Sequence, residues 1–324
     1  MNSIDAKLDG IERQRHAVLP TPVHELPVFS KLYGCKVFCK RDDLTGFGFG
    51  GNKARKLDFL VADALRSRCD TLLAVGANQS NFCRMVAAYG SAHDMEVHLV
   101  LGGKEPGAPT GNLRLDHILG AECHHVDSSD WDEWEARAAA LEADLRRKGR
   151  TVYRMPVGGS TPIGTLGYVG AMSEIMDDET RLGVSFDTLV FATSSAGTQA
   201  GLVAGKALAN WPGRILGISV AKAGDTQRQD VFALAQETAA RFQCPIDRQD
   251  VRVDDAYLGS GYACNTKACE DAVHLFARKC GIFLDYVYTG KAAAGLLDYL
   301  ETGRFSPGSS ILFLHTGGNI ELLA

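Results

Sequence analysis

The fold is decided by a part of the sequence that begins with Thr71-Leu72-Leu73-Ala74-Val75, a short and mainly apolar run. An amphipathic helix is predicted next, over residues 79–89, and a second apolar strand follows at residues 97–101. Apolar strands that alternate with helices indicate a parallel sheet covered on both faces. The sequence is therefore predicted to belong to the α/β class.

The same alternation continues on both sides of this stretch. Further strands are predicted at 36–40, 123–126, 151–153, 188–192, 215–220 and 311–314, and further helices from Asn52 through Leu65, at 113–119, after Asp130, and at 199–209, 231–242, 269–279 and 291–300. No repeat, low-complexity tract or composition shift marks a linker. We therefore expect two α/β halves packed together, with a cleft where their strand ends meet.

Length and charge exclude several classes of partner. The 324 residues suffice for about two domains. The 34 Lys and Arg against 39 Asp and Glu give a net charge of −5, which disfavours binding to nucleic acid or to anionic lipid. No apolar stretch is long enough to span a bilayer, and no signal peptide is recognised at the N-terminus. We expect a cytoplasmic protein without membrane or nucleic-acid partners.

The nine cysteines include no Cys-x-x-Cys pair. Such pairs build most cysteine-based zinc and redox sites. We therefore expect reduced thiols and no metal site.

A glycine-rich loop, Gly46-Phe47-Gly48-Phe49-Gly50-Gly51, formally satisfies the dinucleotide-binding pattern G-x-G-x-x-G. Charged residues precede it, however, and no acidic residue follows the strand at 71–75, where the ribose of a dinucleotide is normally bound. Read as a P-loop, it is one residue too long and lacks a Ser or Thr after Lys53. A nucleotide-dependent oxidoreductase therefore remains only as a rival hypothesis.

Lys53 lies in the first turn of the helix that follows this loop. The positive end of the helix dipole disfavours a second cation there, which should lower the pKa of Lys53 and expose a nucleophilic amine. The alternative is a surface lysine that points into water. The position alone leaves both interpretations open.

A second loop, residues 193–201, joins a buried strand to a helix and is rich in Ser, Thr, Gly and Ala. Its hydroxyls and backbone N–H groups at a helix N-terminus suit a phosphate, although a plain glycine-rich turn is the alternative. A reactive lysine and a phosphate cradle in different halves of one chain together suggest pyridoxal 5′-phosphate, which carries an aldehyde and a phosphate.

Seven short motifs then occur in the order found in a known enzyme family. They are Lys40-Arg41-Asp42-Asp43-Leu44, Gly50-Gly51-Asn52-Lys53-Ala54-Arg55-Lys56, Gln79-Ser80-Asn81, Pro156-Val157-Gly158-Gly159-Ser160, Gly197-Thr198-Gln199-Ala200-Gly201, Tyr288-Thr289-Gly290-Lys291 and His315-Thr316-Gly317-Gly318. With these motifs the chain resembles the pyridoxal-phosphate enzymes of the tryptophan synthase β-like fold. Within them it is similar to the D-cysteine desulfhydrase and 1-aminocyclopropane-1-carboxylate deaminase family.

The resemblance implies roles for individual residues. Lys53 is the Schiff-base lysine, Asn81 a donor to the pyridoxal 3′-oxygen, and Ser80 a contact of the substrate carboxylate or an aid to proton transfer. The phosphate loop corresponds to Ser194, Ser195, Ala196, Gly197 and Thr198, and two active-site tyrosines correspond to Tyr262 and Tyr288. Without the resemblance, each tyrosine would be read as a core residue.

Two threonines bear on the substrate. The aminocyclopropane-carboxylate deaminases that resemble this chain carry Glu in place of Thr289 and an apolar residue in place of Thr316. A carboxylate would keep the pyridine nitrogen protonated, whereas a threonine hydroxyl can serve a neutral nitrogen. The threonines agree with the desulfhydrase pattern, and we expect Thr316 rather than Thr289 to contact that nitrogen.

Departures from the desulfhydrase pattern occur at Asn78 and at Phe82-Cys83, next to Ser80. They could alter which leaving group is held, and cysteate with its sulfonate is one possibility. The expected substrate-binding residues are Asn78, Gln79, Ser80, Asn81, Phe82 and Gly159.

The sequence thus predicts a β-eliminating lyase that releases pyruvate, ammonia and a sulfur leaving group from a small 3-substituted alanine, of the D-cysteine desulfhydrase type. An L-cysteate sulfo-lyase is the alternative, ring opening of aminocyclopropane carboxylate is less favoured, and a non-catalytic pyridoxal-phosphate-binding protein is the rival from another class. The family further implies a homodimer and two three-layer domains with open, twisted, mainly parallel sheets and the cofactor between them. We place the large domain at 1–53 and 161–324 and the small domain at 54–160.

Overall fold

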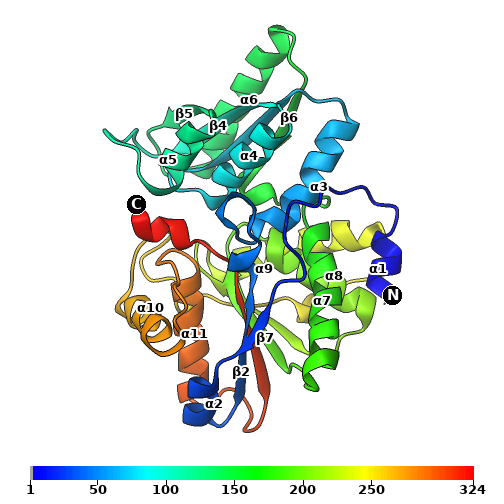
Figure 1. Cartoon of the computed structure of the whole chain (residues 1–324), viewed down its shortest axis with the longest axis vertical. Helices are drawn as coiled ribbons and strands as arrows, with labels where there is room; N and C mark the ends of the chain where they lie inside the picture. The colour runs from blue at the N-terminus through cyan, green and yellow to red at the C-terminus, as the bar shows by residue number, and fades with distance from the viewer. Residues whose placement is uncertain (1–2) are drawn as a thin grey trace.

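Two sheets organise the chain in the computed structural model, which describes residues 3–324 (Figure 1). The larger sheet has six strands in the order β1-β2-β10-β7-β8-β9, and the smaller has four in the order β5-β4-β3-β6. Neighbouring strands run parallel everywhere except between β1 and β2. The predicted fold class, with two open and mainly parallel sheets, is confirmed.

The strands of the larger sheet are β1 (Val23–Glu25), β2 (Lys36–Arg41), β7 (Thr188–Thr193), β8 (Arg214–Ser219), β9 (Arg252–Asp254) and β10 (Ser310–His315). Those of the smaller sheet are β3 (Thr71–Ala77), β4 (Glu96–Gly102), β5 (Glu122–Val126) and β6 (Val152–Met155).

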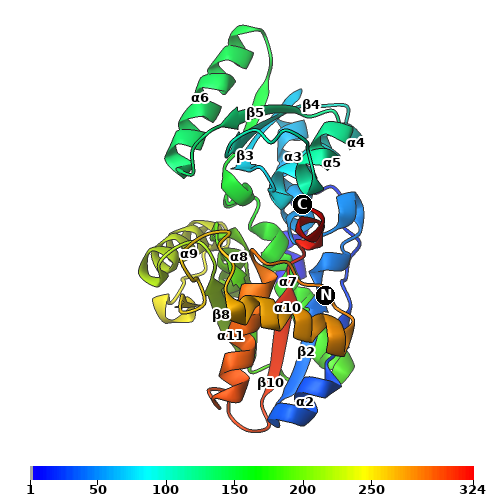
Figure 2. The same cartoon turned by 90° about the vertical axis from the view of Figure 1, so that its left-hand side faces the viewer.

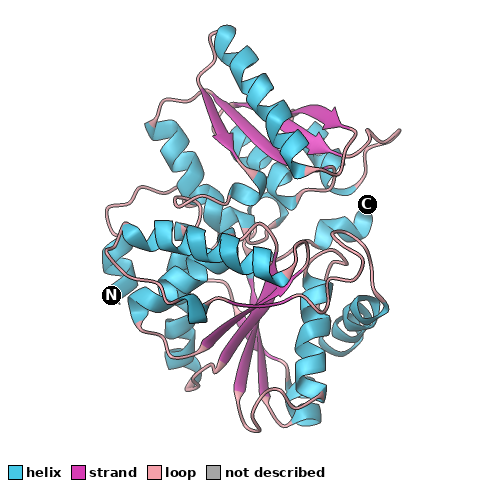
Figure 3. Cartoon of the chain, turned by 180° about the vertical axis from the view of Figure 1, so that it is seen from behind, coloured by secondary structure: helices cyan, strands magenta, loops and turns pink. Residues whose placement is uncertain are grey.

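The helices are α1 (Ser3–Leu8), α2 (Pro27–Tyr33), α3 (Lys53–Arg66), α4 (Asn81–Ala92), α5 (Gly111–Ile118), α6 (Trp131–Arg147), α7 (Leu166–Leu182), α8 (Gly197–Ala209), α9 (Gly224–Ala240), α10 (Lys267–Cys280) and α11 (Thr289–Glu301). Short 3₁₀ turns are η1 (Asp42–Leu44), η2 (Phe47–Phe49), η3 (Val157–Gly159), η4 (Arg248–Asp250) and η5 (Asn319–Leu323). Figure 3 shows the helices on both sides of the larger sheet.

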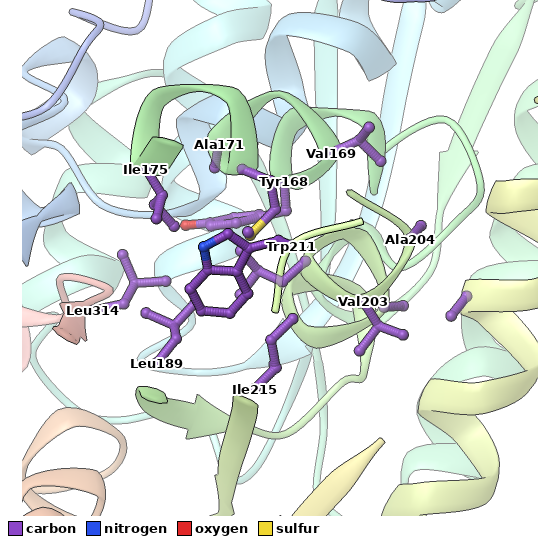
Figure 4. Packing of buried hydrophobic residues seen from close by; sticks show 14 of the residues in the cluster. Tyr168, Val169, Ala171, Ile175, Leu189, Val203, Ala204, Trp211, Ile215 and Leu314 are labelled. Atoms are coloured by element: carbon purple, nitrogen blue, oxygen red, sulfur yellow. The ribbon is translucent and has the colours of Figure 1, made fainter. Parts of the chain in front are cut away.

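The strands of the larger sheet are apolar on both faces because both faces are covered. Leu189 and Phe191 of β7 point into a core shared with α7 and α8, whereas Val190 between them joins a second core with α10 and α11. Figure 4 shows the first core, where Trp211 lies among Leu189 and other buried side chains. A strand buried on both faces loses the polar alternation of a surface strand, which is why its sequence reads as a continuous apolar run.

The smaller sheet is built in the same way. Leu72 and Ala74 of β3 pack with α3 and α4, while Leu73 and Val75 pack with α6. Each sheet is therefore the middle of three layers.

Helix α7 is the main element that the sequence analysis did not predict. Its apolar residues Leu166, Val169, Met172 and Ile175 recur at helical spacing and are fully buried, so a signal was present. Buried polar residues such as Ser173, together with two glycines, interrupted that pattern. Gly167 is needed because its backbone packs directly on that of Arg55. The short elements β1, α2 and β9 were also missed.

Helix α3 lies between the two sheets. Its residues Leu57, Leu60 and Val61 belong to the core of the smaller sheet, whereas Phe59 packs into the core of the larger one. The domain limits at 53/54 and 160/161 stay a prediction. Among residues 3–324, no helix is both long and apolar enough to cross a membrane.

Candidate active site

A pocket lies between the two sheets, at the carboxyl ends of strands β3, β7 and β10. Residues directly after each of these strands, or at their last positions, line it: Ala77, Thr193 and Thr316. This edge of a parallel sheet is where open α/β folds bind ligands. Lys53, Ser80, Asn81, Phe82, Ser194, Ser195, Ala196, Thr198, Tyr262 and Tyr288 line the same pocket.

Lys53 is the first residue of α3 and reaches into this pocket. Burial lowers the pKa of its ammonium to about 8. The helix position predicted this direction, and the structure identifies removal from water as the cause. At mildly basic pH, a substantial fraction of Lys53 is therefore the neutral, nucleophilic amine.

A second lysine, Lys56, follows one turn later and was not singled out from the sequence. It is fully buried, and its Nζ donates a hydrogen bond to the Gly158 carbonyl at 3.1 Å. Burial and the neighbouring Lys53 charge both lower the pKa of Lys56. A Cβ atom on Gly197 would approach Lys56 Nζ to 2.5 Å, so this ammonium lies directly behind the phosphate loop.

The loop itself has the backbone of an anion site. Ala196 adopts φ 68°, in the left-handed region that residues with a side chain rarely occupy, immediately before α8 begins at Gly197. The first N–H groups of a helix have no intrahelical partner and are available to an anion. Asn52 Nδ2 donates to Thr198 Oγ1 at 3.1 Å, which ties this loop to the one that carries Lys53. Asn52 is thus the N-cap residue of α3, but its side chain makes no hydrogen bond to the backbone of that helix.

These residues fit the phosphate and aldehyde of pyridoxal 5′-phosphate. The described residues that line the pocket include Lys53 and Arg84 but no Asp or Glu. Lys53 and Lys56 therefore lie close together without a neighbouring carboxylate in that lining, and an anionic group held by the α8 loop would compensate them. The sequence analysis considered only the hydroxyls and N–H groups of the loop at 193–201, and it missed Lys56, which reaches the loop from another element.

Ser80 and Asn81 begin α4 at the pocket wall. Ser80 Oγ caps the helix by accepting a hydrogen bond from the Cys83 N–H at 3.2 Å. Asn81 Oδ1 accepts from Asn112 Nδ2 at 3.1 Å, which fixes the amide and leaves its Nδ2 group as a donor for a ligand. The predicted roles of both residues remain predictions, and their positions are compatible with them.

Tyr262 and Tyr288 lie side by side in the pocket lining. Their hydroxyl oxygens are 2.5 Å apart, so they share a hydrogen bond. Burial raises the pKa of Tyr262 to about 12 and also raises the pKa of Tyr288, which keeps both hydroxyls protonated at physiological pH. Trp131, the first residue of α6, packs edge-on against Tyr262 with ring centroids 6.1 Å apart. The sequence did not identify Trp131 as a site residue.

The two threonines occupy different surroundings. Thr316 lines the pocket, whereas Thr289 lies outside its lining. The Thr289 hydroxyl donates to Asp285 Oδ1 at 2.5 Å and accepts from the Asp285 N–H. This arrangement favours Thr316 as the partner of a pyridine nitrogen.

Three of the expected substrate-binding residues do not reach the pocket. Asn78 is hydrogen bonded to His125 Nδ1 at 2.9 Å and to the Lys104 carbonyl, and Gln79 is hydrogen bonded to the backbone of Asn112 and Thr110. Both side chains therefore hold the loop after β4. Gly159 adopts φ 62° and gives room to the Phe82 ring, where a Cβ atom would come within 2.8 Å of it. Phe82 itself lines the pocket.

Arg84 was also missed by the sequence analysis. It is buried, lines the pocket, and donates to the carbonyls of Gly48 and Gly50, the latter at 3.2 Å. Burial lowers its pKa to about 10, an effect that Asp116 partly opposes. Arg84 thus holds the Gly46–Gly51 loop against α4, and this loop contributes Gly50 and Gly51 to the pocket wall.

Comparison with known proteins identifies the class. The family model described as pyridoxal-phosphate dependent enzyme matches residues 15–317. The chain therefore belongs to the family of pyridoxal-phosphate dependent enzymes, and the predicted cofactor is confirmed.

Relatives define the group within this family. A D-cysteine desulfhydrase of Salmonella schwarzengrund is 38% identical over 313 residues, which cover 94% of this chain and 93% of that protein. A Pyrococcus furiosus protein, provisionally named a 1-aminocyclopropane-1-carboxylate deaminase, is 41% identical over 298 residues, covering 92% and 89%. A crystal structure of an aminocyclopropane-carboxylate deaminase homologue superposes with a TM-score of 0.93 at 37% identity, covering 100% of this chain and 97% of the other. The chain is a pyridoxal-phosphate-dependent lyase of the deaminase and desulfhydrase group, as the motifs predicted.

Proposed function

We propose that the protein eliminates a sulfur leaving group from the β-carbon of a small 3-substituted alanine, as a D-cysteine desulfhydrase does. The observation that carries this proposal is the pocket: it combines the Lys53 amine, a pair of protonated tyrosines and the Thr316 hydroxyl with no lining carboxylate among the described residues. D-Cysteine is the substrate class we place first.

Residues Ser194–Thr198, with Lys56 behind them, would hold the phosphate of the cofactor, and Lys53 would meet its aldehyde. Once bound, it supplies an electron sink for the negative charge left when the α-proton is removed. The donor available to its 3′-oxygen is Asn81 Nδ2.

The side chains of the pocket then handle the protons. Lys53, with its lowered pKa, is a base of suitable strength for the α-proton. The Tyr262–Tyr288 pair holds a proton that can be donated to the departing sulfur, since both hydroxyls stay protonated. Phe82, Trp131 and Trp134 line the same pocket and limit the entry of water. The released fragment hydrolyses to pyruvate and ammonia.

The position of Thr316 supports elimination over ring opening. A hydroxyl next to the pyridine nitrogen does not hold that nitrogen protonated as a carboxylate would, so the electron sink is weaker. A departing thiol needs a weaker sink than the opening of a carbon ring. Aminocyclopropane carboxylate is therefore our less favoured substrate.

One observation favours L-cysteate as a second candidate. Among the described residues, Arg84 Nε is buried without a hydrogen-bond partner, and Arg84 lines the pocket. A sulfonate could use such a donor. Asn78, which the sequence suggested for this role, no longer supports it because its amide is engaged elsewhere.

We further propose that the protein acts in the cytoplasm as a homodimer on a free amino acid. The nine cysteines are all free thiols, which is usual in a reducing compartment. Large apolar side chains at Leu44 and Phe49 are exposed near the glycine-rich loop and could be covered by a second copy. Light scattering of the purified protein gives the mass that tests this.

A parallel assay decides among these functions. Purified holoenzyme is given D-cysteine, L-cysteine, L-cysteate or aminocyclopropane carboxylate, and 2-oxo acid, ammonia, sulfide and sulfite are measured. We expect the highest kcat/KM with D-cysteine, with equal amounts of pyruvate, ammonia and sulfide. Sulfite from L-cysteate would establish the second candidate. Release of 2-oxobutanoate from aminocyclopropane carboxylate would show that ring opening, our less favoured reaction, is the activity. A yellow protein that turns over none of them would be a binding protein, and a protein that binds no pyridoxal phosphate would reopen the oxidoreductase hypothesis.

A further inference from the structure

A cluster of two histidines and one glutamate lies on the smaller sheet, outside the active-site pocket. His98 belongs to β4, and Glu122 and His124 belong to the neighbouring edge strand β5. His98 and Glu122 are directly paired in the sheet register, and His124 is two residues further along β5. Since side chains two residues apart on a strand share one face, all three point to the same side of the sheet.

One ligand atom from each of these side chains lies within 4.8 Å of the other two, and the Glu122 carboxylate uses one oxygen toward each histidine. His98 Nδ1 is 3.1 Å from His124 Nε2, Glu122 Oε1 is 3.3 Å from His124 Nε2, and Glu122 Oε2 is 3.6 Å from His98 Nδ1. Tetrahedral Zn²⁺ with bonds of about 2.0–2.1 Å places its ligand atoms roughly 3.3 Å apart. The His98–His124 distance and the Glu122 Oε1–His124 distance each match an edge of such a tetrahedron to within a few tenths of an ångström, and the contact to His98 comes from the other Glu122 oxygen.

His98 is also oriented as a metal ligand usually is. Its other ring nitrogen, Nε2, lies 2.7 Å from Glu96 Oε1. A carboxylate that accepts the N–H of a ligating histidine fixes the ring tautomer, and here it leaves Nδ1 with a lone pair toward the cluster. In the tautomer of His124 that carries its hydrogen on Nδ1, the Nε2 atom likewise has a lone pair toward the cluster.

We propose that His98, Glu122 and His124 bind a divalent transition-metal ion of the Zn²⁺ type, with a fourth position open to water. Two imidazoles and a carboxylate are donors that suit zinc better than calcium or magnesium. His98 is buried, whereas the Glu122 side chain is 63% exposed, so an ion can enter from solvent on that side.

The charges around the cluster are mixed: Glu96 and Glu122 favour a cation, and three basic side chains oppose it. Arg150 already pairs with Glu96 at 2.5 Å, and Arg137 of α6 and Lys148 just after it lie near His124 and Glu122 respectively. The ion would join edge strand β5 to β4. The expectation of no metal came from the lack of paired cysteines, and it did not consider ligands supplied by two adjacent strands.

Metal binding to the holoenzyme tests this proposal. The protein is stripped with a chelator and titrated with Zn²⁺ against a chromophoric competitor, then with Co²⁺ as a spectroscopic substitute. We expect one ion per chain, a Co²⁺ spectrum of a four- or five-coordinate site without thiolate bands, and a higher melting temperature with zinc. His124→Asn and Glu122→Gln should each weaken binding at least tenfold, and Glu96→Gln by about 10–100-fold.

Two controls make the result specific. His117→Asn removes a histidine of α5 outside the cluster, and Cys264→Ser removes an exposed thiol; neither should change zinc affinity. The absorption of the bound cofactor and the melting temperature without metal report whether each variant is folded. Glu122→Gln alters a mostly exposed side chain and serves if His124→Asn does not fold. No binding by the wild type at micromolar zinc, or equal affinity in the wild type and Glu122→Gln, would overturn the proposal.

Discussion

Lys53 and Lys56 lie one turn apart on α3, yet their surroundings give them different roles. Lys53 reaches the open pocket, whereas Lys56 is enclosed and bound to the Gly158 carbonyl behind the phosphate loop. Burial lowers the pKa of both amines, and the charge of Lys53 adds to the effect on Lys56. The first is placed to react, and the second to hold an anion.

The lowered pKa of Lys53 predicts how cofactor capture depends on pH. Only the neutral amine attacks an aldehyde, and a group with a pKa of about 8 is neutral above that pH. The rate at which apoenzyme binds pyridoxal phosphate, followed by absorbance, should rise as the pH is raised through about 8 and then level off. With an ordinary lysine pKa of about 10.4 it would still be rising there. Lys53→Ala should show no such covalent capture, and a flat profile through this range would contradict the assignment.

Replacing Lys56 tests its role at the phosphate. Lys56→Met keeps the length of the side chain but removes the charge, and a lost charge-assisted hydrogen bond costs about 1.5–3 kcal/mol. The affinity for pyridoxal phosphate should therefore fall about 10–100-fold. Affinity for pyridoxal, which lacks the phosphate, is the matched control and should change little. An equal loss for both ligands would show that Lys56 only supports the fold.

Among individual residues, the sequence predicted those site residues that belong to recognisable short motifs. Lys53, Ser80 and Tyr288 were predicted and line the pocket. Lys56 and Arg84 were not, because their importance depends on burial against loops distant in the sequence. Asn78 lies next to Ser80 in the chain, but its side chain leaves the pocket for His125, and sequence proximity could not show that.

A buried ion-pair network connects the elements around α3. Arg55 donates to Asp42 of η1 at 2.8 Å and to Glu174 of α7 at 2.7 Å, and Tyr168 of α7 donates to Asp42 at 2.6 Å. Burial alone would raise the pKa of Asp42, but the Arg55 guanidinium outweighs it and the net pKa is lowered. The network fixes the helix whose first residue is Lys53.

Removing Arg55 should therefore destabilise the protein strongly. Arg55→Met leaves Asp42 buried without its main partner, and breaking a buried ion pair from one side costs about 3–5 kcal/mol. The free energy of unfolding in denaturant measures this. Arg66→Met, on the same helix but with an exposed pair to Asp63, is the control and should cost less than about 1 kcal/mol. Equal effects would mean that burial of the network contributes nothing.

Lowering the pH should weaken the same ion-pair network. The pKa values of Asp42 and Glu174 are lowered in the folded protein, so their contribution is present above the ordinary carboxyl pKa of about 4 and is lost as the pH falls below it. The difference in stability between wild type and Arg55→Met should shrink on acidification.

Elements with a regular pattern could be predicted from the sequence, and irregular ones could not. The buried strands β3 and β7 were recognised because they are continuously apolar. Helix α7 was missed because Ser173, which donates to Asp5, and Gly167, which packs on the Arg55 backbone, replace apolar residues on its buried face. Strand β9 has only three residues and lies at a sheet edge, so it carries little signal.

The C-terminal segment lies between the part of the chain with the smaller sheet and the part with the larger sheet (Figure 2). Trp131 of α6, which covers the smaller sheet, packs on Tyr262. Its ring centroid lies 5.3 Å from Nζ of Lys222, a residue that follows strand β8 of the larger sheet. Near the chain end, Ala324 lies against Gly111 of α5.

Loss of the Trp131 contact should affect turnover more than folding. An aromatic pair contributes about 0.5–1.5 kcal/mol, so Trp131→Ala should lower kcat/KM roughly 2–12-fold while the cofactor stays bound. Trp131→Phe keeps a ring at the same place and should retain most of the activity. Unchanged kinetics in Trp131→Ala would show that the contact does not shape the working pocket.

The most direct test of the central claim is to locate the covalent attachment of the cofactor. Holoenzyme is reduced with borohydride, digested, and analysed by peptide mass spectrometry. The account predicts one pyridoxyl group per chain, on Lys53, with no label in Lys53→Ala. A label on Lys56 or on any other lysine of the wild type, or no label at all, would contradict it.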